Sequence, residues 1–242
     1  EDKDYRYLEE NSETLLKEYF ETFDAIIIDE GQQFSIDQLN SLRKLLTKDN
    51  FHSFNIFADP LQSPHSKWRV PKWCFRFPNL NLNYRNTQPI VDYMSKVINS
   101  SLPDCKFEGI EPKFIFSRDE NKFKNLLLKE WNNFTIKSEI DSKDITILSP
   151  SRSALNEIHK LIEKSYEDNN IDQSLTVLAG QFRTIDEFTG MESQGVILLW
   201  PKSKINKFEI KQQKRRAYQG IGRATDKITI ISSQKESELW KI

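Results

Sequence analysis

The sequence predicts an α/β protein built on a parallel β-sheet, and three observations support this class. Short apolar runs recur along the chain, most of these runs are continuous rather than alternating, and helical patterns lie between them. Continuous apolar runs suit strands that are buried on both faces of a parallel sheet. Alternation of strands with helices is typical of the α/β class.

Seven apolar runs are predicted as strands. They are Ala25–Ile28, Phe54–Ala58, Phe114–Phe116, Ile145–Leu148, Leu175–Leu178, Val196–Trp200 and Ile228–Ile231. Helices are expected between them. Ser35 and Gln38 form a capping box before leucines at helical spacing, and Pro89 suits the first turn of a second helix. Two more helices are expected over 123–131 and 155–162.

The composition indicates a soluble globular protein of one large or two modest domains. The 242 residues carry a net charge of -1, and 37% of them are hydrophobic. No apolar run reaches the roughly 18 to 20 residues of a membrane span, and no signal-peptide pattern is present. Cys74 and Cys105 lack metal-ligand spacing. We therefore expect a cytoplasmic protein without a membrane partner, in which a local basic groove is still compatible with the near-neutral charge.

The motif Asp29-Glu30-Gly31-Gln32 follows the first apolar run and is the most informative part of the chain. A buried strand would deliver two carboxylates to its carboxyl end, where open α/β sheets bind ligands. In P-loop ATPases the first carboxylate at such a place holds Mg²⁺, and the second can orient or deprotonate an attacking water. An acidic loop in which Ser35 caps the next helix explains the same residues, so both interpretations stay open here.

Three weaker motifs follow. Asp59 and Gln62 end the second strand and could bring an amide near a phosphate, although Asp-Pro is a common turn. Arg85, in Asn83-Tyr84-Arg85-Asn86, could reach a phosphate through its planar guanidinium or be an ordinary surface arginine. Glu192 could accept hydrogen bonds from a ribose, or belong to a tight turn at Gly190 between two strands.

The last motif, Tyr218-Gln219-Gly220-Ile221-Gly222-Arg223-Ala224, precedes the final strand. Two glycines inside a helical pattern cost about 1 kcal/mol each relative to alanine. That cost indicates close packing or a functional site, although a frayed helix end explains it too. The small neighbours of Arg223 are expected to leave its side chain room to extend.

In order and spacing these motifs resemble the UvrD/Rep-like superfamily 1 helicases, from about Asp24 to the C-terminus. No motif is specific alone, whereas five in the right order are strong evidence. The resemblance implies two RecA-like domains with ATP between them and a single nucleic-acid strand across their tops. Residues 1–82 would be the C-terminal part of the first domain and 83–242 the second, with a hinge within Pro78–Arg85.

The resemblance also implies roles for individual residues. Asp29 and Glu30 would form the Mg²⁺ site, and Glu30 would activate water. Gln62 would sense the γ-phosphate. Arg85 and Arg223 would be arginine fingers that neutralise charge developing on the transferred phosphoryl group.

Further residues would contact the nucleotide. Glu192 would contact its sugar, and Gln32 and Tyr84 are candidates for binding it as well. For Tyr84, as for Tyr218, the main expected contribution is to support the neighbouring arginine by packing.

The segment from Lys67 to Phe77 interleaves cations with aromatic residues, which suits single-stranded nucleic acid. Trp68-Arg69 resembles the aromatic–arginine pair whose ring stacks on a base in this family. Trp68 is equally well explained as packing, and the later aromatic residues, Trp73, Phe75 and Phe77, are expected in the core. Thr189 occupies a position that contacts nucleic acid in the family.

The chain departs from the family pattern in several places. Ala58 replaces a favoured glycine, Thr189-Gly190 replaces Lys-Gly, and Gly222 replaces the Thr or Ser before the arginine. No Gly-x-x-x-x-Gly-Lys-Ser/Thr loop, which cradles phosphates, occurs in the 242 residues. Because the chain starts at Glu1 in mid-pattern, we expect this loop upstream, and a degenerate ATPase is the alternative.

The sequence therefore predicts the C-terminal part of an ATP-dependent helicase or translocase. It would use ATP and Mg²⁺ and move on single-stranded DNA, with RNA as an alternative partner. In this family, large strand-separating domains are inserted between the Asn-Tyr-Arg and Thr-Gly-Met-Glu motifs. Here the stretch between them is scarcely longer than the core needs, so translocation without strong unwinding is expected. The alternative is a non-catalytic nucleic-acid-binding or regulatory module with a helicase-like fold.

A first prediction is that the 242-residue chain alone hydrolyses no ATP. Phosphoryl transfer depends on positioning and electrostatics, so loss of the phosphate cradle should abolish turnover even with Glu30 and both arginines present. Phosphate release from ATP by the purified chain measures this. Turnover that disappears in Glu30→Gln would contradict the prediction.

Overall fold

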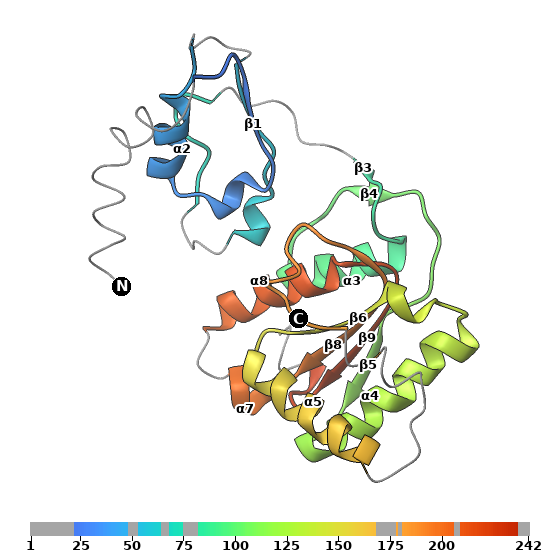
Figure 1. Cartoon of the computed structure of the whole chain (residues 1–242). Coiled ribbons are helices and arrows are strands. Elements are labelled where there is room, and N and C mark those ends of the chain that lie inside the picture. The colour runs from blue at the N-terminus through green and yellow to red at the C-terminus, as the bar shows by residue number, and fades with distance from the viewer. Residues whose placement is uncertain are drawn as a thin grey trace. The chain divides into compact units, whose positions relative to one another are not determined.

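The computed structural model describes residues 22–47, 53–63, 68–74, 82–167, 178, 181–205 and 209–236. The chain forms two compact units, Glu1–Pro78 and Asn79–Ile242, here called unit 1 and unit 2 (Figure 1). The assignment of 1–82 and 83–242 to separate RecA-like domains stays a prediction. None of the helices in the described ranges is long and apolar enough to cross a membrane.

Unit 1 is built on a pair of parallel strands. Its elements are β1 (Ile26–Ile28), η1 (Gly31–Gln33), α2 (Ile36–Arg43), β2 (Phe54–Ile56) and η2 (Pro60–Gln62). The strands pair in parallel, with Ile28 opposite Ile56 at their carboxyl ends. The predicted capping box opens α2, since the Ser35 hydroxyl accepts the Gln38 N–H and the Gln38 side chain accepts the Ser35 N–H.

Unit 2 is a five-stranded parallel sheet in the order β5-β9-β8-β6-β7. The strands are β5 (Lys113–Phe116), β6 (Ile145–Ser149), β7 (Phe182–Thr184), β8 (Ser193–Trp200) and β9 (Ala224–Ser232). The α-helices are α3 (Gln88–Ile98), α4 (Phe123–Asn132), α5 (Arg152–Glu167), α7 (Lys202–Ile205) and α8 (Ile210–Ile221). The α/β class and the parallel sheet flanked by helices are confirmed.

Short elements complete unit 2. The strands β3 (Leu82–Asn83) and β4 (Asp104–Cys105) form a separate parallel pair. The short helical segments are η3 (Glu120–Lys122), η4 (Asn133–Lys137) and η5 (Ser142–Asp144). Figure 1 shows helices on both sides of the sheet.

The central strand β8 is buried on both faces, as its continuous apolar run predicts. Val196, Leu198 and Trp200 belong to the core cluster shared with α3 and α8. Ile197 and Leu199 belong to the cluster shared with α4 and α5. All five side chains have an exposed fraction of 0%. The period of two along a strand therefore divides one apolar run between two helical layers.

Close packing explains the glycine at position 220 inside α8. A Cβ placed there would lie 3.1 Å from Cδ1 of Ile185 and 3.2 Å from Cδ1 of Leu198. The prediction of close packing is confirmed at this position. The helix ends at Ile221, so Gly222 lies at its C-cap rather than in its interior.

Some strands differ from the prediction. Most of the predicted strand Leu175–Leu178 lies outside the described residues, and Leu178 itself is helical and buried. The observed strand β7 was missed because its sequence, Phe182-Arg183-Thr184, carries one apolar residue and no run. An edge strand such as β7 pairs on one side only, and its short length gives little periodic signal. β2 ends at Ile56, two residues before its predicted end.

A buried carboxylate joins α4 to the sheet of unit 2. The side chain of Glu130 is 2% exposed, and its Oε1 accepts hydrogen bonds from Lys113 Nζ at 2.6 Å and Asn133 Nδ2 at 3.0 Å. Its Oε2 accepts the Thr229 hydroxyl at 3.2 Å. Since Lys113 lies on β5 and Thr229 on β9, this carboxylate ties the helix to two neighbouring strands.

We predict that Glu130→Ala lowers the free energy of unfolding by about 1–3 kcal/mol, because it leaves polar groups without their buried acceptor. Urea denaturation of the chain, followed by circular dichroism, measures the loss. The matched control is Lys129→Ala, an exposed change on the same helix, which should stay within about 0.5 kcal/mol of the parent. Equal losses in both variants would contradict the role assigned to Glu130.

Candidate functional site

The carboxyl ends of β1 and β2 bring the polar motifs of unit 1 to one edge. The link between them is Gln32, whose side chain is completely buried. Its Nε2 donates to Oε2 of Glu30, and its Oε1 accepts the Asp59 N–H at 2.9 Å. Glu30 and Asp59, which are far apart in the sequence, are therefore held by one amide. Polar groups from two motifs thus gather at the strand ends, where open α/β sheets bind ligands, and their chemical role stays a prediction.

The backbone at the end of β1 is shaped for this edge. Glu30 has a left-handed conformation with φ of 53°, which is uncommon for a non-glycine residue, and its N–H donates to Asp29 Oδ1 at 2.9 Å. A Cβ added at Gly31 would lie 2.2 Å from Cγ2 of Ile56. The Gly31 N–H donates to the Phe57 carbonyl at 2.8 Å and holds the loop against β2. Because a Cβ would clash with Ile56 at this distance, glycine is required here.

The predicted phosphate sensor Gln62 lies at the same edge. Its Nε2 donates to Asp59 Oδ2 at 3.0 Å, while Asp59 Oδ1 accepts the Leu61 N–H at 2.9 Å. Asp59 therefore caps η2 and holds Gln62 at once. The turn predicted for Asp-Pro is present, and it positions the amide rather than excluding a role for it.

The acidic residues of unit 1 suit a magnesium ion. Asp29 is exposed and Glu30 is half-buried at the end of β1. Mg²⁺ in proteins is usually held by one or two carboxylates, while water and phosphate oxygens supply the other ligands. In the described ranges no group of three or more His, Cys, Asp or Glu side chains could hold a metal ion by itself. A magnesium site shared by Asp29 and Glu30, in which a phosphate supplies further ligands, stays a prediction.

Trp68 and Trp73 are both anchored within unit 1. The half-buried Trp68 donates its indole N–H to the Phe34 carbonyl at 3.1 Å, while Arg69 is exposed. Trp73 donates to Asn40 Oδ1 at 2.7 Å and packs edge-to-face on Phe54, with ring centroids 5.1 Å apart.

Trp73 is thus packed, as expected, although it is only half-buried. Phe75 and Phe77 lie outside the described residues. The base-stacking role of Trp68 stays a prediction.

In unit 2, segments from three predicted motifs meet at the amino ends of β8 and β9. Nε of Arg85 forms an ion pair with Glu192 Oε2 at 2.9 Å. The residue before Glu192, Met191, accepts a hydrogen bond on its carbonyl from Arg223 Nη1 at 3.3 Å. The Ser193 N–H donates to the Arg223 carbonyl at 2.9 Å. The sequence motifs of Arg85, Glu192 and Arg223 therefore form one contact network.

Asn86 completes this network, and sequence reasoning missed it. Its Nδ2 donates to the carbonyls of Gly222 at 3.0 Å and Ala224 at 2.6 Å, on either side of Arg223. Its Oδ1 accepts from Asn83 Nδ2 at 3.0 Å. Asn86 is 3% exposed. The only available signal was an amide directly after Arg85, which is too common to stand out.

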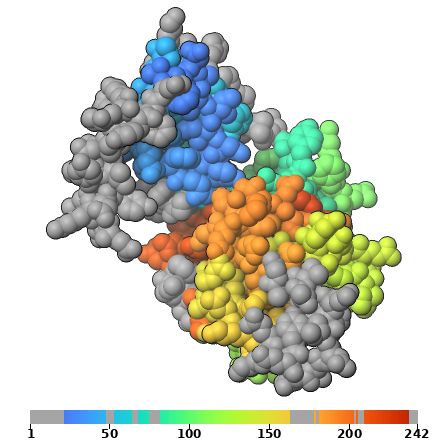
Figure 2. Space-filling view, in the orientation of Figure 1, coloured from blue at the N-terminus to red at the C-terminus, as the bar shows by residue number. Residues whose placement is uncertain are grey.

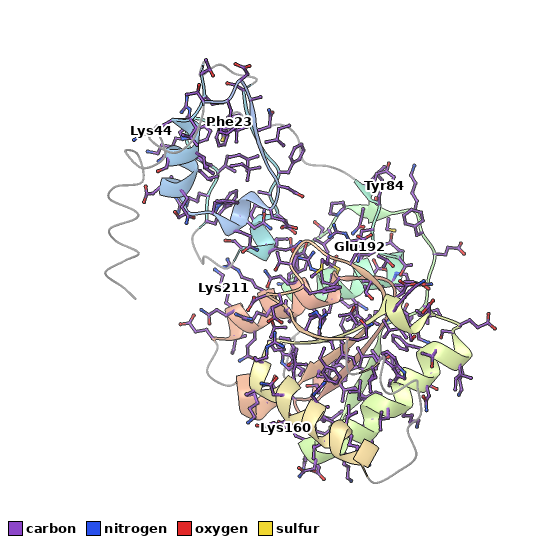
Figure 3. All side chains as sticks on the ribbon, viewed as in Figure 1. Phe23, Lys44, Tyr84, Lys160, Glu192 and Lys211 are labelled. Carbon is purple, nitrogen blue, oxygen red and sulfur yellow. The ribbon has the colours of Figure 1, made fainter. Side chains whose placement is uncertain are left out.

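The two tyrosines of these motifs differ in exposure. Tyr218 is 6% exposed and belongs to the core cluster, in keeping with packing. Tyr84 is 68% exposed, so its expected contribution through packing is wrong, although its role as a nucleotide contact stays a prediction. Figure 3 shows Tyr84 and Glu192 at the same end of unit 2.

Arg223 also differs from expectation. It is 2% exposed, so the prediction that its side chain has room to extend is wrong. Arg85, whose side chain is 40% exposed, is the more accessible of the two predicted fingers. The physical reason is that Arg223 lies in the tight turn between α8 and β9, directly before a strand that is covered by α3 and α8.

The segment before β8 makes a turn at the surface of unit 2, seen in orange in Figure 2. Gly190 has φ of 78°, a conformation that favours glycine, and Thr189 beside it is half-buried. A hollow of about 380 Å³ opens next to this turn, and Glu192, Lys143 and Arg183 are among its lining residues. The Lys143 ammonium donates to the Asp141 carboxylate at 3.2 Å, and this hydrogen bond raises the pKa of Lys143.

Comparison with known proteins bears on the fold. No family model and no curated protein matches the sequence. Arterivirus nonstructural protein 10, a helicase, aligns over 92% of this chain and 42% of its own chain, at 14% identity and a TM-score of 0.50. The structure of its complex with DNA aligns over 93% of this chain and 43% of its own chain, at 13% identity and a TM-score of 0.50. The chain thus spans less than half the length of these helicases.

The C-terminal domain of a possible DNA helicase from Lactobacillus plantarum WCFS1 is also similar. It aligns over 62% of this chain and 86% of its own, at 16% identity and a TM-score of 0.46. Likeness to the arterivirus structures at such low identity shows a shared fold alone. The UvrD/Rep-like assignment and the roles of individual residues stay predictions.

We predict that Trp68 contributes to binding of single strands through its ring. Loss of one base stack costs roughly 1–3 kcal/mol of binding free energy. Trp68→Ala should therefore weaken the affinity for a fluorescent oligonucleotide, measured by anisotropy. Trp68→Phe keeps a ring while losing the indole donor to Phe34, so it should retain most of the affinity.

A merely structural Trp68 gives the opposite pattern. Both variants would then bind the oligonucleotide normally and would be less stable, because both lose the hydrogen bond to Phe34. Thermal unfolding of the same samples separates the two outcomes. Unchanged affinity in folded Trp68→Ala would end the stacking prediction.

Proposed function

We propose that this chain is the C-terminal part of an ATP-dependent translocase or helicase of the UvrD/Rep-like type, acting on single-stranded DNA. The observation that carries the proposal is the network joining Arg85, Glu192 and Arg223 in unit 2. These residues belong to three motifs that lie far apart in the sequence, and each motif carries a polar group suited to a nucleotide. Contact among them is expected if all three act on one nucleotide.

Unit 1 would supply metal-binding and water-activating groups. Glu30 is oriented by the buried amide of Gln32, which would hold the carboxylate in a fixed direction toward water. Gln62 is likewise held by Asp59. ATP would bring Mg²⁺, which neutralises phosphate charge when it is bound by Asp29.

Unit 2 would supply sugar, base and phosphate contacts. Glu192 borders the hollow, and its carboxylate can accept hydrogen bonds from ribose hydroxyls. The exposed ring of Tyr84 can stack on a planar base. Arg85 would exchange its ion pair with Glu192 for a phosphate, because a guanidinium binds either oxyanion in the same planar geometry.

A second function is favoured by one observation, the burial of Arg223. An arginine that serves the fold of unit 2 would suit a non-catalytic nucleic-acid-binding or regulatory module. The two functions differ in what loss of this side chain does, and a catalytic assay separates them.

We predict that Arg223→Ala in the full-length protein lowers ATP turnover by about 10³ or more, because an arginine finger acts mainly in the transition state. Nucleotide affinity should change far less. Arg223→Lys should rescue poorly, since an ammonium lacks the planar fork. Steady-state turnover with single-stranded DNA, together with nucleotide titrations, measures both quantities.

The non-catalytic module predicts another pattern. Arg223→Ala would then lower the melting temperature, because a buried side chain is lost, while Arg85→Ala and Glu30→Gln would leave nucleic-acid binding unchanged. Normal turnover in folded Arg223→Ala protein would rule out the catalytic role of this arginine.

A further inference from the structure

We infer that Asn86 is a positioning residue for Arg223, and that it couples Arg223 to Arg85. The inference rests on the proposed function, in which both arginines act on a nucleotide. It assigns to Asn86 a task that the sequence motifs did not indicate: to fix where the Arg223 guanidinium points.

The Asn86 side-chain amide donates two hydrogen bonds to the backbone around Arg223. A carboxamide carries two N–H donors, and Asn86 Nδ2 bonds the carbonyls of Gly222 and Ala224. These two peptide groups flank Arg223 directly. The amide therefore holds the backbone on both sides of Arg223, where α8 ends and β9 begins.

Asn86 is also connected to the backbone of Arg85, through Asn83. Asn86 Oδ1 accepts from Asn83 Nδ2 at 3.0 Å, and Asn83 Oδ1 in turn accepts the backbone N–H groups of Arg85 at 2.9 Å and Asn86 at 3.0 Å. The two side chains thus fix the loop that carries Arg85. One pair of asparagines supports the backbone of both arginines.

The side chains of the two arginines are linked through neighbouring residues, Met191 and Glu192. Arg223 Nη1 donates to the Met191 carbonyl, and the next residue, Glu192, pairs with Arg85. Because Asn86 is 3% exposed, its hydrogen bonds do not compete with bulk water. A shift of the peptide at Gly222 or Ala224 would be passed on to the guanidinium.

The experiment in the full-length protein is a double-mutant cycle for ATP turnover with single-stranded DNA. Asn86→Ala should lower turnover by about 10²-fold, the order expected when a catalytic group is misplaced by about 1 Å. If Asn86 acts mainly through Arg223, the reduction in the double variant Asn86→Ala/Arg223→Ala should be clearly smaller than the product of the two single reductions. A double variant whose reduction in turnover equals the product of the two single reductions would overturn the inference.

Asn86→Asp tests the donors specifically. It keeps the shape and the acceptor for Asn83 but removes both N–H groups, so it should lower turnover as much as Asn86→Ala. The stability control is Ile158→Val, a small change in the core cluster on the opposite face of the sheet. This control should keep full turnover, and a tenfold loss in it would attribute the Asn86 effect to general destabilisation.

A second measurement tests whether Asn86 positions Arg223, and it does not depend on ATP turnover. In the 242-residue chain labelled with ¹⁵N-arginine, the Nε–H signal of Arg223 is identified by its loss in Arg223→Lys. We expect this signal to shift in Asn86→Ala and to remain in place in Ile158→Val. An unchanged signal in folded Asn86→Ala would overturn the inference.

Failure of the proposed function and failure of the Asn86 inference give different results. A full-length protein that shows no turnover on any single strand would count against the proposed function, while the Arg223 signal would still decide whether Asn86 positions this arginine. A shifted signal with wild-type turnover in Asn86→Ala would overturn the claim that the positioning serves the reaction.

Discussion

Burial of the central strands on both faces is the constraint on which unit 2 depends. From Val196 to Trp200 every side chain of β8 is completely buried, alternately against α3 and α8 or against α4 and α5. Such a strand has no face left for polar chemistry. Hydrogen-bonding and charged groups must therefore gather in the segments that precede or follow the strands, where Glu192 and Arg223 lie.

The polar groups of each unit lie at one end of its strands, which is the carboxyl end in unit 1 and the amino end in unit 2. In unit 1 the acidic residues follow the carboxyl ends of β1 and β2, the usual position for ligands in open α/β sheets. In unit 2 the arginine network precedes the amino ends of β8 and β9. The preference of ligands for the carboxyl ends of parallel strands therefore accounts for Asp29 and Glu30. It does not account for Arg223, whose predicted role comes only from a family resemblance.

The buried Arg223 shows how local sequence can mislead. Its neighbours Gly222 and Ala224 are small, which indicated free space around the side chain. Their smallness serves another purpose, because a Cβ at position 222 would lie 3.0 Å from Cε of Met94 and 3.2 Å from the Tyr218 carbonyl. Small residues here let α8 end against α3, and the arginine between them is enclosed by the same packing.

The sequence by itself determined four of the five strands of the parallel sheet in unit 2, the capped helix α2 and the polar residues at strand ends, since apolar periodicity and capping act over a few residues. It missed β7, whose three residues form no apolar run. Only the tertiary structure decided which loops meet. Asn86 reaches carbonyls 136 and 138 residues away, and Gln32 reaches Asp59 across 27 residues. Such contacts follow from the folding of distant segments onto one sheet, and no local pattern specifies them.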